Sequence, residues 1–369
     1  MDYKKVLTGI AAGLLLYAQA GFSLANAAVP LDAPKDIKYI VGFYYGNGEN
    51  ILIRENKGNL ELLYRFAMSD KSFAGANIYP LTKQHFDSYT LTEAGPMAAS
   101  EANVKFERDQ DGYGISCRVG GHLYSRGFLG HGTGERAKAF RLPEITAEKW
   151  TELRNTAANA VEPQTLIDGT QAQLVDVATI PGVKVNSVYA TTDNCFGAAL
   201  YTSPKLFISK EVAVSLANVQ KVLAAKGYGL VVWDAYRPWS VSKLANLALP
   251  DNGKDMLEDP ETKGSPHNTG HAVDVGLYDL TSGVEVEMTS GFDEPSLRQF
   301  ASYAGGTTRQ RYLRELLREV MTDNGFNGIE MEWWHFEHQA LKGAAHLNIP
   351  LENICLLYTS PSPRDGLLS

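Results

Sequence analysis

The sequence predicts an α+β protein in which a small antiparallel β domain precedes a larger domain of mixed helices and strands. Residues 37–128 contain short runs of β-branched and aromatic residues separated by turns rich in Gly, Asn and Asp, a pattern typical of antiparallel strands. After about residue 164, helical and extended segments follow one another without the regular alternation of a parallel α/β sheet. The length of 369 residues agrees with two domains at roughly 150 residues each.

The N-terminal half contains two predicted β-hairpins. Residues 51–54 and 60–64 flank an Asn-Lys-Gly-Asn turn, and residues 104–108 and 113–119 flank a Gln-Asp-Gly turn. We therefore expect an antiparallel sandwich or barrel. This half has no recognisable metal-ligand spacing, so the residues assign it no chemistry, and we predict an accessory role.

The C-terminal half is predicted to contain both strong helices and strands. Helical spacing covers residues 144–160, 209–226 and 309–323, and extended segments cover residues 228–233 and 328–336. Ser209 is a suitable N-cap for the second helix, and Gly227 follows its end. The domain boundaries predicted from this pattern are 28–135 for the β domain, 136–165 for a helical linker and 166–353 for the second domain.

Composition and the chain ends limit the compartment and the partners. With 34 Lys and Arg against 42 Asp and Glu, the formal net charge is −8, which argues against nucleic acid as a partner. Residues 1–27 resemble a secretory signal peptide, because a basic start and a short apolar stretch precede an Ala-Asn-Ala cleavage motif. We expect an exported mature chain without a membrane span, with the periplasm as its compartment. Residues 354–369 have no periodicity and are interpreted as a non-native tail.

Residues able to perform chemistry concentrate in three short segments. These are 233–238 (WDAYRP), 265–274 (SPHNTGHAVD) and 330–335 (EMEWWH). A catalytic zinc site requires three His, Asp or Glu ligands, an open coordination position and a carboxylate outside the coordination shell that accepts a proton. The three segments together contain the residue types that such a site needs.

Five residues in these segments could form that site. His267, Asp274 and His335 can supply the ligands, Glu332 can act as the base, and Arg237 can stabilise an oxyanion. The same spacings also occur by chance in proteins that bind no metal, so spacing alone leaves a purely structural role open. In a regular strand, residues 332 and 335 point to opposite faces. Their joint use therefore requires a bulge, a twist or a strand end at the metal.

The three segments and the later string 290–293 (SGFD), taken in this order, resemble the D-alanyl-D-alanine dipeptidases. That family belongs to the zinc peptidases that also include D,D-carboxypeptidases and share the hedgehog-like fold. The resemblance covers residues 170–350 and leaves the β half unexplained. It implies one Zn²⁺ per catalytic domain and a hydrolase that cleaves free D,D-dipeptides from peptidoglycan metabolism with water activated by the metal.

The resemblance also implies roles for individual residues. It implies His267, Asp274 and His335 as zinc ligands, Glu332 as general base and proton shuttle, and Arg237 as the group that steadies the tetrahedral oxyanion.

The resemblance further implies that Asp293 receives the substrate ammonium and that Ser265 bonds the substrate backbone. Tyr236 is expected either to contact the substrate or only to pack beside Arg237. Two alternatives stay open. One is a murein D,D-carboxypeptidase or endopeptidase of the same metal group. The other is a non-catalytic cell-wall binding protein, in which the β domain would contact the wall.

Overall fold

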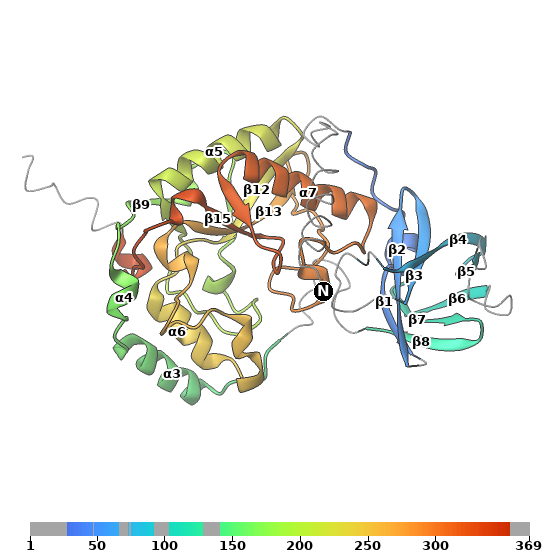
Figure 1. Ribbon diagram of the computed structural model, residues 1–369, viewed down its shortest axis with the longest axis horizontal. Coiled ribbons are helices and arrows are strands. Elements are labelled where there is room, and N and C mark those ends of the chain that lie inside the picture. Colours follow the sequence, from blue (N-terminus) through green and yellow to red (C-terminus); the bar gives the residue numbers. More distant parts are fainter. Residues whose placement is uncertain are drawn as a thin grey trace, which may run out of the picture.

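The computed structural model describes residues 28–46, 48–65, 73, 75–91, 103–127 and 141–354. Residues 1–27 and residues 355–369 lie outside this description, so the signal peptide and the non-native tail stay predictions. Figure 1 shows a β barrel beside a larger part that combines helices with a sheet. The predicted α+β class with an N-terminal antiparallel β domain is confirmed. Among the described residues, no helix has both the length and the apolar character needed to cross a membrane.

In the described residues, the N-terminal part is a closed antiparallel barrel of eight strands. Each strand pairs with its neighbour in sequence, and β8 closes the barrel against β1. The strands are β1 (Gly42–Gly46), β2 (Glu49–Asn56), β3 (Asn59–Tyr64), β4 (Asn77–His85), β5 (Ser88–Leu91), β6 (Asn103–Arg108), β7 (Gly114–Val119) and β8 (His122–Arg126). Both predicted hairpins are present, as β2–β3 and β6–β7. A short helix, α2 (Lys35–Lys38), precedes the barrel.

Alternating apolar residues fill the barrel interior. Tyr44 contacts Phe106 with ring centroids 5.9 Å apart, and Phe106 contacts Tyr89 at 5.7 Å. Ile51 and Ile53, two residues apart on β2, are fully buried beside them. The interior is therefore a packed core of side chains.

The C-terminal part is built on a five-stranded sheet with the order β10-β12-β13-β15-β14. These strands are β10 (Lys184–Val185), β12 (Tyr228–Asp234), β13 (Ala272–Asp279), β14 (Phe326–Gly328) and β15 (His335–His338). A two-stranded sheet pairs β9 (Leu174–Asp176) with β11 (Phe207–Ser209). The α-helices of this part are α3 (Ala147–Asn159), α4 (Gln164–Ile167), α5 (Lys210–Ala224), α6 (Trp239–Ala248) and α7 (Thr308–Asp323). As predicted, Ser209 caps α5, since its Oγ accepts a hydrogen bond from the Val212 amide.

The predicted strand at residues 328–336 is wrong. Its two ends are separate strands, β14 and β15, which pair antiparallel, and residues 329–334 form the loop between them. The apolar pattern there comes from two tryptophans buried in the loop, whose backbones bond elsewhere. The Trp333 amide donates to the Gln299 carbonyl, and the Trp334 carbonyl accepts from the Val275 amide.

The segment predicted as a helical linker contains α3. This helix begins at the Thr146 cap and packs against α6. Trp150, Leu153 and Ala157 on its buried face belong to the core of the C-terminal part. Helix α3 therefore packs in the core of the C-terminal part. The predicted domain boundaries stay a prediction.

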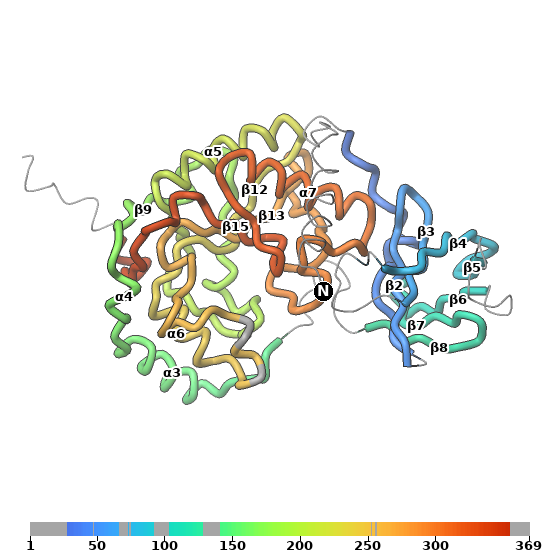
Figure 2. Tube along the Cα trace, viewed as in Figure 1, coloured from blue at the N-terminus to red at the C-terminus, as the bar shows by residue number. Residues whose placement is uncertain are grey.

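An apolar cluster and a helix cap join the barrel to the C-terminal part. Figure 2 shows the trace of the barrel strands beside that of the larger part. Phe43, Leu52 and Leu63 from the barrel pack with Tyr303. The Glu55 carboxylate accepts a hydrogen bond of 2.6 Å from the Thr308 amide at the start of α7. The barrel therefore supplies an acceptor to one of the free amides of that helix.

Candidate active site

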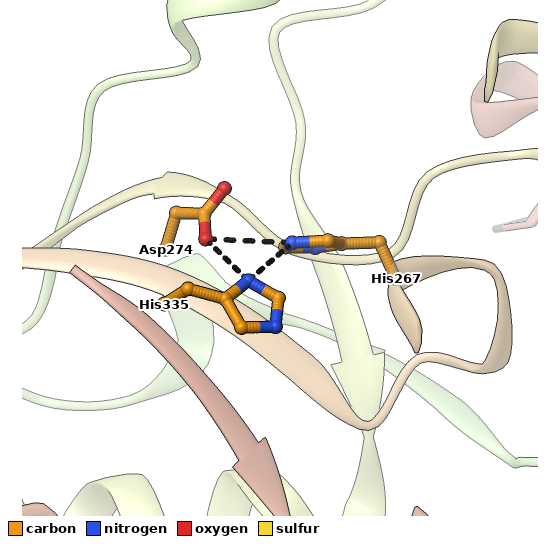
Figure 3. Close-up of side chains that lie close together, drawn as sticks. All are labelled: His267, Asp274 and His335. Carbon is orange, nitrogen blue, oxygen red and sulfur yellow. Dashed lines mark hydrogen bonds and ion pairs between the residues drawn. The ribbon is translucent and has the colours of Figure 1, made fainter. Parts of the chain in front are cut away.

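The three predicted metal ligands meet at one place (Figure 3). His267 lies in the short 3₁₀ helix at residues 266–269, Asp274 lies on β13, and His335 begins β15. Asp274 and His335 are direct cross-strand partners. His335 Nδ1 is 3.0 Å from Asp274 Oδ1, His267 Nε2 is 3.1 Å from His335 Nδ1, and His267 Nε2 is 3.4 Å from Asp274 Oδ1. All three side chains are buried.

These distances fit a tetrahedral zinc site. With zinc–ligand bonds of about 2.0–2.1 Å, two ligands of a tetrahedral ion lie about 3.3–3.4 Å apart. The other ring nitrogens also face suitable acceptors: His267 Nδ1 is 2.7 Å from the Ala235 carbonyl, and His335 Nε2 is 3.5 Å from Glu337 Oε1. Such outer partners fix the ring orientation of histidine ligands. The residues can therefore hold Zn²⁺ and leave a fourth position open.

A tight turn positions His267. Ser265 Oγ accepts from the His267 amide at 3.3 Å, and the Ser265 amide donates to Asn268 Oδ1 at 2.8 Å, which forms a capping box. Gly270 ends the turn with φ of +74°, and a Cβ there would lie 2.6 Å from Leu174 Cδ2. Only glycine fits this bend between the first two ligands.

Glu332 lies in the loop directly before β15, so the alternation of side chains along a strand does not apply to it. Its Oε2 is 4.0 Å from His335 Nδ1, and its carbonyl accepts from the His335 amide at 3.3 Å. The strand end that the sequence argument required is thus present. Burial and the negative charge of Asp274 raise the pKa of Glu332, and a carboxylate with a raised pKa is a better proton acceptor.

Arg237 follows β12 and is held by Asp234. Its Nε and Nη2 donate to Asp234 Oδ2 at 3.0 and 2.5 Å, and its guanidinium stacks 5.2 Å from the centre of the Tyr189 ring. Burial opposes its charge, but the negative charge of Asp234 outweighs burial and raises the pKa of Arg237. Arg237 therefore stays protonated, with part of its donor set facing the cavity.

Asp293 also lines this cavity. Its Oδ2 accepts from the Tyr189 hydroxyl at 2.6 Å. Burial, with a further contribution from Asp274 and Glu332, raises the pKa of Asp293 to about 7, against the effect of the Tyr189 hydrogen bond. Its backbone is left-handed, with φ of +56°, a conformation that non-glycine residues adopt mainly where the surrounding structure imposes it.

The cavity enclosed by these residues has a volume of about 280 Å³. It is smaller than the roughly 300–1,000 Å³ typical of pockets for drug-sized ligands. The predicted site residues that line it are His267, Asp274, His335, Glu332, Arg237, Asp293 and Ser265. The structure thus brings together seven of the eight predicted residues.

Tyr236 is the predicted site residue that the structure places elsewhere. Its side chain is fully buried, and its hydroxyl donates to the Ile349 carbonyl and accepts from the Ile349 amide. The hydroxyl thus acts as both donor and acceptor within the protein, and Tyr236 does not line the cavity.

Among the lining residues that were not predicted, Tyr189 and Glu337 directly contact predicted site residues. Tyr189 lies in no motif and reaches the cavity only because β12 and the loop after β13 converge on it. Glu337 follows His335 by two residues, so the period of a strand could have placed both side chains on one face.

Comparisons with known proteins agree on this region. A family model described as "D-ala-D-ala dipeptidase" (Peptidase_M15) matches residues 170–350. A D-alanyl-D-alanine dipeptidase of Escherichia coli (strain K12) is 36% identical over 166 residues, which cover 45% of this chain and 84% of that protein. One of Enterococcus faecalis (strain ATCC 700802 / V583) is 33% identical over 174 residues, covering 42% and 86%.

A solved structure also shows a distant likeness. It is a vancomycin resistance D,D-pentapeptidase, VanY, in complex with Zn(II), with 16% identity and a TM-score of 0.25. The likeness covers 38% of this chain and 78% of that one. At this TM-score the likeness carries no structural argument.

Proposed function

The chain belongs to the D-alanyl-D-alanine dipeptidase family, and from this premise we propose that it is an exported, zinc-dependent dipeptidase that hydrolyses free D,D-dipeptides such as D-Ala-D-Ala. One observation carries the proposal: three ligand atoms within 3.4 Å of one another share a small cavity with a carboxylate and a guanidinium. Export rests on the signal-like residues 1–27.

His267, Asp274 and His335 would hold the ion. Zn²⁺ bound there would polarise the substrate carbonyl and ease the deprotonation of water. Glu332 would accept the proton from the attacking water and pass it to the leaving nitrogen. Arg237, kept charged by Asp234, would donate hydrogen bonds to the oxygen on which negative charge develops.

Substrate selection follows from the charged ends of a free dipeptide. A charged group that is buried without a partner is strongly unfavourable, so the cavity must pair the substrate ammonium. Asp293 would do so when ionised, and Ser265 would bond the substrate backbone. A cavity of about 280 Å³ suits a dipeptide better than a pentapeptide.

Hydrolysis assays on the zinc-loaded mature chain test the proposal. The substrates are D-Ala-D-Ala, L-Ala-L-Ala and a pentapeptide ending in D-Ala-D-Ala. We expect turnover of the D,D-dipeptide alone. Turnover of the pentapeptide would instead support the murein carboxypeptidase or endopeptidase alternative, and binding to sacculi without any hydrolysis would support the cell-wall binding alternative. Fractionation of a tagged full chain tests the periplasmic location.

A further inference from the structure

A second polar cavity lies between the barrel and the C-terminal part. It has a volume of about 280 Å³ and shares no lining residue with the catalytic cavity. Its walls come from α2, the ends of β1 and β8, residues 287–289, Arg298 and the start of α7. We call it the interdomain cavity, because both parts of the chain line it.

The charged residues of this lining are mostly basic. They are Lys35, Lys38, Arg126 and Arg298 against Asp32 and Glu287, which gives 4 − 2 = +2. The two acids already serve Lys38, whose Nζ lies 3.1 Å from Asp32 and 2.6 Å from Glu287. In a chain of net charge −8, this cavity therefore presents an excess of positive charge.

The two arginines carry that excess. Arg126 donates to the backbone carbonyls of Tyr39, Val41 and Gly114. Within the described part of the chain, Arg126 has no carboxylate at ion-pair distance. Burial, reinforced by the positive charge of Arg298, lowers the pKa of Arg126. An anion near both guanidiniums would offset the repulsion between their positive charges.

Arg298 is fixed at the cavity wall. Its Nε donates to the Thr289 carbonyl at 2.6 Å and lies 3.5 Å from Glu294 Oε1. Its two terminal nitrogens have no hydrogen-bond partner among the described residues. The guanidinium is therefore held in place with donor capacity left for a ligand.

The Thr289 hydroxyl provides a second, independent observation. Thr289 is 1% exposed and lines the cavity, and its Oγ1 has no hydrogen-bond partner among the described residues. A buried hydroxyl without a partner is destabilising and calls for an explanation. A ligand oxygen in the cavity would provide the missing partner.

We propose that the interdomain cavity binds a small oxyanion, a carboxylate or a phosphate group, through Arg126, Arg298 and Thr289. Planar guanidinium groups match the paired oxygens of these anions, and a hydroxyl adds a donor of adjustable direction. The bound anion contacts the barrel and the C-terminal part together. This site is separate from the proposed catalytic function and does not depend on it.

Calorimetric titration of the full mature chain tests the site, with inorganic phosphate and acetate as probes and sodium chloride at equal ionic strength as the reference. Thr289→Val removes a hydroxyl that has no protein partner while keeping the shape, so the fold should be preserved. Arg298→Gln removes the charge. Ser187→Ala is the matched control, because Ser187 is also a buried hydroxyl without a partner and lies outside the cavity lining.

We expect saturable binding of phosphate or acetate at one site. Binding should weaken about tenfold in Thr289→Val and at least tenfold in Arg298→Gln, since each loses a hydrogen bond to a charged group, and it should be unchanged in Ser187→Ala. The tighter probe identifies the ligand as a phosphate or a carboxylate. Binding no stronger than that of chloride, or binding in Thr289→Val and Arg298→Gln that is as strong as in the unmodified chain, would overturn the proposal, because the anion would then sit elsewhere, for instance at the metal site.

Discussion

The barrel and the C-terminal part differ in what they bury. Among the described barrel residues, Glu55 and Ser116 are the buried polar side chains, and the rest of the interior is aliphatic or aromatic. The C-terminal part buries many charged and polar groups, including Asp234, Arg237 and Asp274. Each buried charge there lies beside an opposite charge or a hydrogen-bonding group, as it must to be tolerated. The comparison shows that the candidate site combines strand residues of the C-terminal sheet with residues of the loops beside it, while the barrel interior is filled by apolar side chains.

The largest effect on activity is expected from removal of a proposed metal ligand in the C-terminal part. His335→Ala removes one of three ligands, so we expect zinc to be lost and D-Ala-D-Ala hydrolysis to fall by more than the roughly 10–100-fold cost of losing an outer partner. Metal analysis and initial rates measure both effects. His271→Ala, at another buried histidine in the segment 265–274, should keep its zinc. Equal zinc content in the two variants would remove His335 from the ligand set.

Removal of the proposed base should separate chemistry from metal binding. Glu332→Gln keeps the size of the side chain but cannot accept the proton, so kcat should fall by about 10²–10⁴ while zinc is retained. Glu330→Gln is the control, because the Glu330 carboxylate accepts hydrogen bonds from Ser302 and does not line the cavity. A fully active Glu332→Gln would show that another group moves the proton.

The Asp293 carboxyl should affect the stability of the fold and the binding of substrate in opposite directions. Its pKa of about 7 in the folded chain exceeds its ordinary value of 3.8. Above pH 3.8 the unfolded chain releases this proton more readily, so the ionisable carboxyl lowers the stability of the fold as pH rises toward 7. At 1.36 kcal/mol per pKa unit, the cost reaches about 4 kcal/mol at pH 8.

Asp293→Asn should therefore stabilise the metal-free protein, with a gain that is small near pH 4 and largest above pH 7. The same variant should raise KM for the dipeptide, because the ammonium loses its partner. Urea unfolding at pH 5 and pH 8 measures the gain, and Asp279→Asn should give none, because hydrogen bonds from Ser282 lower the pKa of this carboxyl at the end of β13. A gain that does not depend on pH would contradict the raised pKa.

The smallest effect is expected at the junction of the two parts. Glu55→Gln weakens the charged cap of α7, so stability should fall by about 0.5–1 kcal/mol without a change in kcat. Glu107→Gln is the matched control within the barrel, where the carboxylate accepts, among the residues that the structure describes, from Ser116. Equal losses in the two variants would show that the cap contributes nothing beyond an ordinary barrel contact.

Local signals in the sequence predicted the local features of the fold. The turns of both hairpins and the Ser209 cap depend on residues close together in the chain, so the sequence was sufficient to predict them. The division of residues 328–336 into two strands depends on where Trp333 and Trp334 find space in the core. Such long-range packing has no signature in the spacing of residues.

The candidate site also combines features that local sequence signals predict with features that depend on long-range packing. The ligand motif contains its own bend at Gly270, and the resemblance named seven residues that the structure brings to one cavity. The sequence could not show whether Tyr236 or Tyr189 reaches the cavity. Tyr236 lies next to Arg237 in sequence but bonds to Ile349, whereas Tyr189, far away in sequence, covers Arg237 and bonds to Asp293. Only the folded chain decides which tyrosine reaches the cavity.

The cap that Glu55 provides links positions 253 residues apart, and this has a consequence for the order of synthesis. The barrel strands pair with their sequence neighbours, apart from the closure of β8 on β1, so the barrel can close while the rest of the chain is still being made. Helix α7 emerges much later and meets a surface that already carries its cap. A nascent chain that mispairs its early strands would therefore lack the carboxylate that caps α7 at Thr308, while α7 would still pack against α5 and β14.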